Sequence, residues 1–265
     1  MDADLLTDFL IKVVATSTIL MTASLVAERA GVVLAALIIA LPLNAGPGFF
    51  FVARVVEPAF LAHSALISFT GVFAVHTYVT VYAHASGRFS GFWPTWAVAT
   101  VVWGIVSWPI VTYEPDFLAA TILVAVSFGL SNLFRYKGYD QSGGGDKAKR
   151  KGGIGFLLVR ALIGSCAVAL AATFTKSLGP SLTGVAFAFP VILSANAWML
   201  HTSYGPKFAA ATISNTRNGL ISYTSFCFAL ALLPGHVSNM MAWTLALAIS
   251  VLASLMLLGL RRWRH

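Results

Sequence analysis

The chain has 265 residues, of which 58% are hydrophobic and only 10% are charged. Soluble domains carry about 25% charged residues, so this composition excludes an ordinary soluble protein and predicts an integral membrane protein. The formal net charge of +8 is concentrated in 135–151 and 261–265, and both stretches flank apolar segments. This distribution follows the positive-inside rule and gives no support to nucleic-acid binding.

Apolar runs of about 20 residues recur along the chain, and each is long enough to cross the hydrocarbon core as a helix. These runs do not alternate between polar and apolar residues, so they do not fit the strands of a β-barrel. We predict an all-α integral membrane protein with nine transmembrane helices, near 8–29, 31–53, 58–84, 91–112, 116–135, 154–176, 178–203, 206–233 and 237–261.

The only linker predicted from the sequence is 137–153, which is rich in glycine and charge. Its basic residues place it in the cytoplasm, and with nine spans the acidic Asp2 and Asp4 then fall outside and the basic tail inside. Arg54 and Lys176 fall outside and disagree weakly. We therefore expect a multi-pass protein of the bacterial inner membrane, with the N-terminus outside and the C-terminus cytoplasmic.

Glycine, proline and basic residues recur at a fixed offset, which indicates an internal duplication. The matched residues are 148 positions apart: Lys12 and Arg160, Gly31 and Gly179, Pro42 and Pro190, Pro58 and Pro206, Phe60 and Phe208, and Gly71 and Gly219. Four spans in each half plus one connecting helix would invert one half relative to the other, an arrangement found in many secondary transporters. The predicted organisation is a first repeat at 1–112, a connecting helix at 113–136, the linker at 137–153 and a second repeat at 154–265.

The two matched prolines are predicted to interrupt helices within the membrane. Proline removes a backbone donor and frees carbonyl groups, and broken helices form substrate sites in transporters. Asn44 and Gly46 follow Pro42, and Asn196 follows Pro190, so these residues are candidates for solute binding. The alternative is a kink whose freed backbone groups are satisfied within the protein.

Arg217 lies about twelve residues into the eighth expected span, beside Asn215, Thr216 and Asn218. An arginine at this depth is costly, by ~3 kcal/mol or more, unless it faces the interior and binds a partner. Arg217 and Asn215 are therefore further candidates for binding an anionic solute. Snorkelling of Arg217 to the interface is the alternative.

Four more residues are candidates for coupling or gating. His63 and His76 titrate near neutrality and could carry a proton, or could simply be hydrogen-bonded within the bundle. Lys12 and Arg160 lie about one turn inside their spans, where they would snorkel to the interface or form gating pairs.

The second half resembles the GlpM-type family of small four-span bacterial membrane proteins over about 100 residues. The similarity is carried by the opening at 160–164, Lys176, the stretch 183–190, His201 and the region 219–223. The first half matches this family only through the repeat. The resemblance implies that the chain is a fused, inverted pair of such units, and it implies architecture more than activity.

Together these features predict a secondary transporter or permease for a small polar or anionic solute, working by alternating access. The alternatives are a non-catalytic membrane subunit of an envelope or exopolysaccharide assembly, and a lipid flippase. The sequence contains no zinc-protease, Walker or nucleophile-elbow motif, so we expect no enzyme activity, cofactor or metal. The expected partners are the lipid bilayer and a solute, with a homodimer as an open alternative.

Overall fold

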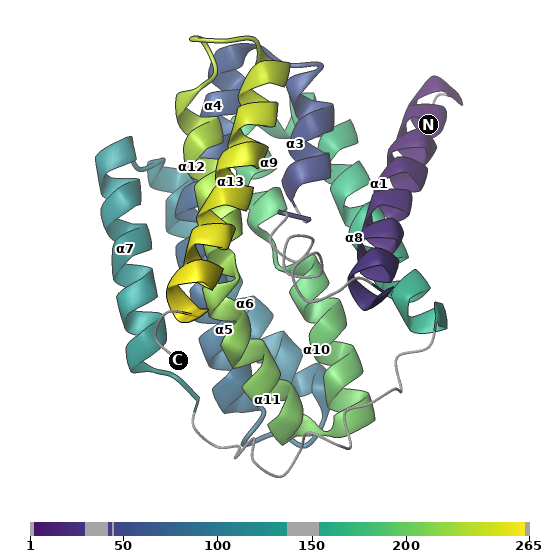
Figure 1. Cartoon of the computed structure of the whole chain (residues 1–265), viewed down its shortest axis with the longest axis vertical. Coiled ribbons are helices and arrows are strands. Elements are labelled where there is room, and N and C mark those ends of the chain that lie inside the picture. Colours follow the sequence, from purple (N-terminus) through teal and green to yellow (C-terminus); the bar gives the residue numbers. More distant parts are fainter. Residues whose placement is uncertain (1–2, 30–41, 44, 137–153, 263–265) are drawn as a thin grey trace.

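The computed structural model describes residues 3–29, 42–43, 45–136 and 154–262. These residues form an assembly of helices without a β-strand among them, shown in Figure 1. The helices in chain order are α1 (Ala3–Arg29), α3 (Ala45–Ala53), α4 (Pro58–Thr70), α5 (Val72–Ala85), α6 (Phe92–Tyr113), α7 (Phe117–Leu133), α8 (Ile154–Thr173), α9 (Thr175–Ala188), α10 (Val191–Tyr204), α11 (Pro206–Asn215), the 3₁₀ turn η2 (Thr216–Asn218), α12 (Leu220–Leu232) and α13 (Asn239–Arg262).

Within the described residues, 6 helical segments are long and apolar enough to cross a membrane, and two shorter apolar helices accompany them. The chain is therefore compatible with a multi-pass membrane protein, as its composition predicts. The count of nine spans stays a prediction, because the expected span at 31–53 is described only at 42–43 and 45–53.

Three of the longer apolar stretches are interrupted along their length. Gly71 separates α4 from α5, and Gly219 together with η2 separates α11 from α12. The interruption expected at Pro190 is present, since α9 ends at Ala188 and α10 begins at Val191. A further kink lies inside α9 at Gly179, whose φ of 76° is a conformation that glycine adopts without steric cost.

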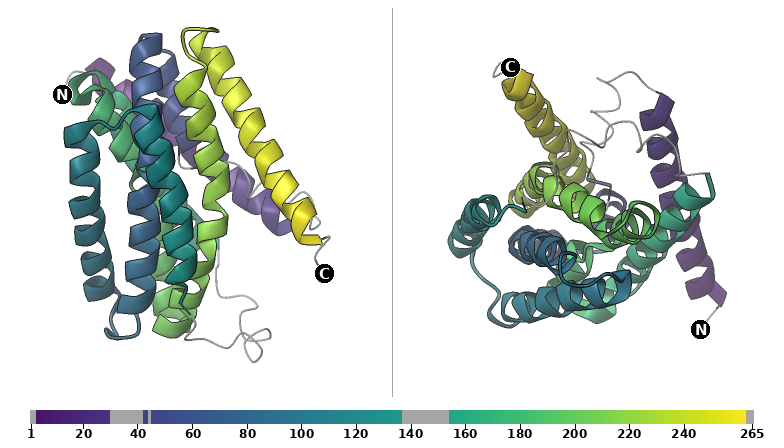
Figure 2. Two further views of the ribbon diagram at one scale, coloured as in Figure 1. Left: turned by 90° about the vertical axis from the view of Figure 1, so that its left-hand side faces the viewer. Right: turned by 90° about the horizontal axis from the view of Figure 1, so that it is seen from below.

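The two halves of the chain are packed closely against each other. Helices α1 and α8 lie side by side and are joined by a hydrogen bond from Ser17 Oγ to Ser165 Oγ of 2.7 Å, across a sequence separation of 148 (Figures 1 and 2). α4 packs on α9, α5 on α6, and α12 on both α4 and α13. Because lipid tails are as apolar as the side chains, such contacts depend on close packing rather than on the hydrophobic effect.

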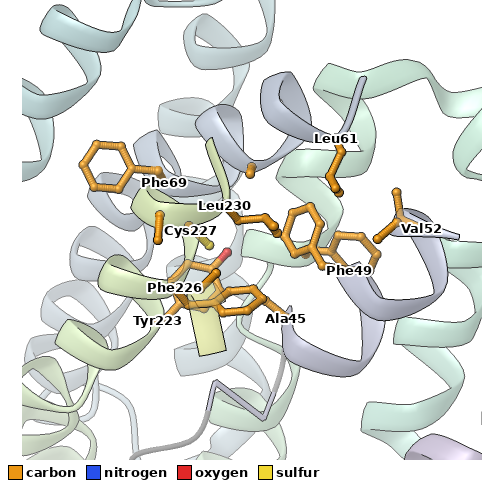
Figure 3. Close-up of a cluster of buried hydrophobic side chains, with 14 of the residues drawn as sticks. Ala45, Phe49, Val52, Leu61, Phe69, Tyr223, Phe226, Cys227 and Leu230 are labelled. Carbon is orange, nitrogen blue, oxygen red and sulfur yellow. The ribbon is translucent and has the colours of Figure 1, made fainter. Parts of the chain in front are cut away.

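The main core lies where α3, α4, α9 and α12 meet, and Figure 3 shows its central side chains. The ring of Phe49 lies 4.8 Å from that of Phe187 and 6.1 Å from that of Phe226, measured between ring centroids. Glycine permits the tightest approaches, since a Cβ at Gly48 would overlap the Phe187 ring and one at Gly184 would lie 2.8 Å from the Cβ of Ile67.

Candidate functional site

A cavity of about 240 Å³ lies between residues 42–43, α9, α10 and α12, with η2 and α5 beside it. We call it the proline cavity, because both matched prolines line it. Its described lining is Pro42, Leu43, Val75, Phe187, Ala188, Pro190, Ile192, Leu193, Asn196, Thr216, Gly219, Leu220, Ser222 and Tyr223.

Two helix interruptions supply this lining. The break at Pro190 starts α10 within the molecule, and Asn196 lies between one and two turns into that helix. The interruption formed by η2 and Gly219 adds Thr216 and Gly219 to the lining. Two sequence positions that are 148 apart, Pro42 and Pro190, thus face one space, in which a few polar groups lie among apolar side chains, as in many ligand sites.

The structure brings together two of the predicted residues that the sequence placed in separate roles. Asn196 Oδ1 accepts a hydrogen bond of 3.3 Å from Arg160 Nη1, so the α8 guanidinium lies next to the proline cavity. In the same helix α10, Ser194 Oγ is 3.0 Å from Tyr78 Oη of α5. The polar side chains of α10 are therefore held in place by two neighbouring helices.

Lys12, the residue matched with Arg160, lies elsewhere. Its Nζ forms an ion pair with Asp8 and lies 3.3 Å from Thr173 Oγ1, near the C-terminal end of α8. Lys12 and Arg160 thus lie on opposite sides of the hydrogen bond between Ser17 and Ser165. Neither side chain is fully exposed, and Lys12 is buried.

His63 is part of a cluster that sequence analysis missed. Its Nε2 lies 3.4 Å from Glu114 Oε2 and 3.3 Å from Ser181 Oγ, and Ser181 also donates a hydrogen bond to Glu114. Serine and carboxylate face the same ring nitrogen, whereas a catalytic triad needs them on opposite nitrogens. The cluster instead ties α4 and the end of α6 to α9.

His76 and His201 are buried and hydrogen-bonded within the bundle. His76 Nδ1 lies 2.8 Å from Ser127 Oγ of α7. His201 Nδ1 lies 3.1 Å from Tyr82 Oη, and its Nε2 lies 3.0 Å from the carbonyl oxygen of Ser90. These contacts hold both rings within the bundle, which is one of the two possibilities that the sequence left open for His76.

Arg217, Asn215 and Gly46 are not among the described lining residues of the proline cavity. Arg217 is buried in η2, which packs on α5, and Asn215 ends α11. Gly46 accepts a hydrogen bond of 2.8 Å from Trp243 Nε1, and Asn44 lies outside the described residues.

Gly46 lines a second cavity of about 260 Å³, between α1, α3 and α13. We call it the apolar cavity, because every described lining residue is apolar. Pro42 and Leu43 line this cavity and the proline cavity alike, so the two spaces are neighbours. The described lining is Ala15, Ile19, Pro42, Leu43, Gly46, Pro47, Phe50, Phe51, Trp243 and Leu247.

No protein-family model, no curated protein and no solved structure matches this chain. In the described part of the chain, no group of three or more His, Cys, Asp or Glu side chains is arranged to hold a metal ion. The polar groups that line the proline cavity are the amide of Asn196 and the hydroxyl-bearing side chains of Thr216, Ser222 and Tyr223, and the guanidinium of Arg160 is hydrogen-bonded to Asn196.

Proposed function

We propose that the chain is a transporter of the inner membrane that binds a small polar or anionic solute in the proline cavity. The observation that carries this proposal is the meeting of Pro42, Pro190 and Asn196 around one cavity, with Arg160 hydrogen-bonded to Asn196. Apolar walls with a few polar groups and a neighbouring cation suit a small anion or a polar solute.

We further propose that residues 1–112 and 154–265 are inverted repeats that move relative to each other. Support comes from features that are 148 positions apart: the contact of Ser17 with Ser165, and helix interruptions at both Gly71 and Gly219. The packing of α5 on α6 is likewise matched by that of α12 on α13. Interfaces between inverted repeats are where secondary transporters bind substrate.

In this proposal, two polar clusters act as gates. The cluster of His63, Glu114 and Ser181 joins α9 of the second half to α4 and α6 of the first. The contacts of His201 with Tyr82 and Ser90 join α10 to α5 and to the loop before α6. Breaking one set while the other holds would open the cavity to one side at a time.

The test is solute binding and uptake in a matched pair of variants. Purified protein is first screened by thermal shift against organic anions and sugars, because any ligand of the folded state raises the midpoint temperature. Asn196→Leu, which removes a polar group from the proline cavity, should abolish the shift and uptake into vesicles. Asn132→Leu, at an exposed site on α7, should change neither. Unchanged uptake by Asn196→Leu would contradict the proposal.

A second candidate, a lipid flippase, is favoured by the apolar cavity. The apolar cavity adjoins the proline cavity at Pro42 and Leu43. One amphipathic molecule would therefore place its acyl chain in the apolar cavity and its headgroup in the proline cavity. Ala15→Trp would fill the apolar cavity, whereas Val14→Trp would add the same ring to an exposed position of α1. Loss of lipid scrambling in Ala15→Trp alone, with solute uptake intact, would favour the flippase.

A further inference from the structure

Arg217 presents a buried positive charge without a counter-charge in the described structure. Its side chain is only 4% exposed, and neither Nε nor Nη1 makes a hydrogen bond there. The ion pairs found among the described residues involve Lys12 with Asp8 and His63 with Glu114, and neither includes Arg217. A buried guanidinium with unused donors is unfavourable, because neither water nor a protein partner compensates its charge.

The groups around Arg217 do not offset this charge. Arg135, just beyond the end of α7, is the charged group that acts on it most strongly, and it repels. The His76 ring of α5 faces the backbone of Arg217 and therefore brings no negative charge to the guanidinium. Ser131 of α7 is also buried, with an unpaired hydroxyl.

These side chains come from elements that contact one another. η2 packs on α5, and α5 packs on α7. A cavity of about 150 Å³ opens between α5 and α7, and His76, Ser127 and Ser131 are among its lining residues. Neither arginine is among the described lining residues of this cavity, although Phe134, the chain neighbour of Arg135, is. Buried unused donors, a second positive charge and a polar space on the neighbouring helices are the arrangement that an anion would complete.

We propose that Arg217, Arg135 and the hydroxyl group of Ser131 bind an oxyanion, a phosphate or carboxylate group, at a site separate from the proline cavity. The planar guanidinium of Arg217 suits an oxyanion because its donors form a fixed fork that pairs with two oxygens. The ligand is either a free anion or the headgroup of an anionic lipid, which supply the same chemistry. This site does not depend on whether the chain transports a solute.

Thermal unfolding of the full chain tests the proposal directly. In detergent, inorganic phosphate should raise the midpoint temperature saturably, compared with sodium chloride at matched ionic strength. In nanodiscs, phosphatidylglycerol should raise it relative to phosphatidylcholine. A response to phosphate identifies a soluble anion, and a response to phosphatidylglycerol alone identifies a lipid headgroup. No response to either overturns the proposal.

Three substitutions locate the site. Arg217→Gln should weaken the affinity for the responding anion by about tenfold or more, because a charge-assisted hydrogen-bonding partner is lost. Arg135→Gln changes an exposed residue that the fold does not need, so it remains informative if Arg217→Gln does not fold, and it should weaken binding too. Arg88→Gln removes one charge from another exposed position and should leave the affinity unchanged.

Two outcomes contradict this assignment. The first is that Arg135→Gln and Arg217→Gln both bind the anion with the same affinity as the wild type. The second is an internal counter-ion: Asp140 and Asp146 follow α7 in the sequence and lie outside the described residues. If Asp140→Asn combined with Asp146→Asn lowered stability without added anion, and raised the affinity for the anion above the wild-type value, the charge of Arg217 would be satisfied within the chain.

Discussion

The interruption at Gly71 and the interruption at Gly219 differ in what surrounds them, although they lie 148 positions apart in matching segments. The first is sealed by α9: Ser68 Oγ donates a hydrogen bond of 2.6 Å to the carbonyl oxygen of Gly184, and a Cβ at Gly71 would lie 2.6 Å from that of Ala188. Phe69, which lies between Ser68 and Gly71 in the sequence, is packed into the main core.

The second interruption borders open space. A Cβ at Gly219 would approach only the carbonyl oxygen of Thr216, one turn earlier, at 3.2 Å. Thr216 and Gly219 line the proline cavity, and Arg217 stands where the first segment has Phe69. The same backbone feature therefore closes a packed interface in one segment and borders two candidate binding sites in the other. Flexibility and ligand binding are expected at the second break.

The largest effect is predicted for Phe69→Arg. This substitution places at the Gly71 interruption the side chain that Arg217 supplies at the Gly219 interruption. An arginine at this core position would be a buried charge without a partner, so we expect a loss of more than about 4 kcal/mol of stability. The yield of monodisperse protein on size-exclusion chromatography should collapse. Phe89→Arg, at a 40% exposed position, is the control and should keep the wild-type yield. A normal yield of Phe69→Arg would show that the first break is not sealed.

Alanine at the two glycines makes the comparison most direct. Gly71→Ala should lower stability by about 1–3 kcal/mol, because α4 and α9 must separate to admit the methyl group. Gly219 has a helical φ of −74°, and no neighbouring helix would contact a Cβ at this position. Gly219→Ala should therefore change the stability by less than about 1 kcal/mol. Midpoint temperatures in one detergent measure both. Equal losses would remove the distinction between the breaks.

Replacing Arg217 by leucine gives the Gly219 interruption an apolar side chain, as Phe69 does at the Gly71 interruption. Without added anion, Arg217→Leu should be more stable than wild type by about 1 kcal/mol or more, because a buried and unpaired charge is removed. With the responding anion at saturation, the order should reverse, since only the wild type gains stability. A variant that is less stable under both conditions would indicate that Arg217 has a structural partner instead.

Local sequence signals predicted the helix interruption at Pro190, because proline lacks a backbone donor and the effect needs no distant partner. The contacts that define the candidate sites were not predictable in the same way. Glu114 reaches Ser181 across 67 positions, and Arg160 reaches Asn196 across 36. Such partners depend on which helix faces meet, and in an apolar chain the sequence pattern does not distinguish lipid-facing from protein-facing sides.

The smallest predicted effect on stability concerns Ser68 and Thr216, the hydroxyl residues that lie three positions before Gly71 and Gly219. Ser68 bonds across to α9, so Ser68→Ala should cost about 0.5–1.5 kcal/mol, the typical value for an interhelical hydrogen bond that is lost without a replacement. Thr216 Oγ1 donates only to the carbonyl oxygen of Ile213, within its own turn, at 2.7 Å. Thr216→Ala should therefore stay within about 0.5 kcal/mol of wild type. Thr216 lines the proline cavity, so Thr216→Ala should nevertheless lower solute affinity if that cavity binds the solute. An unchanged solute affinity in Thr216→Ala would contradict the role assigned to the second break.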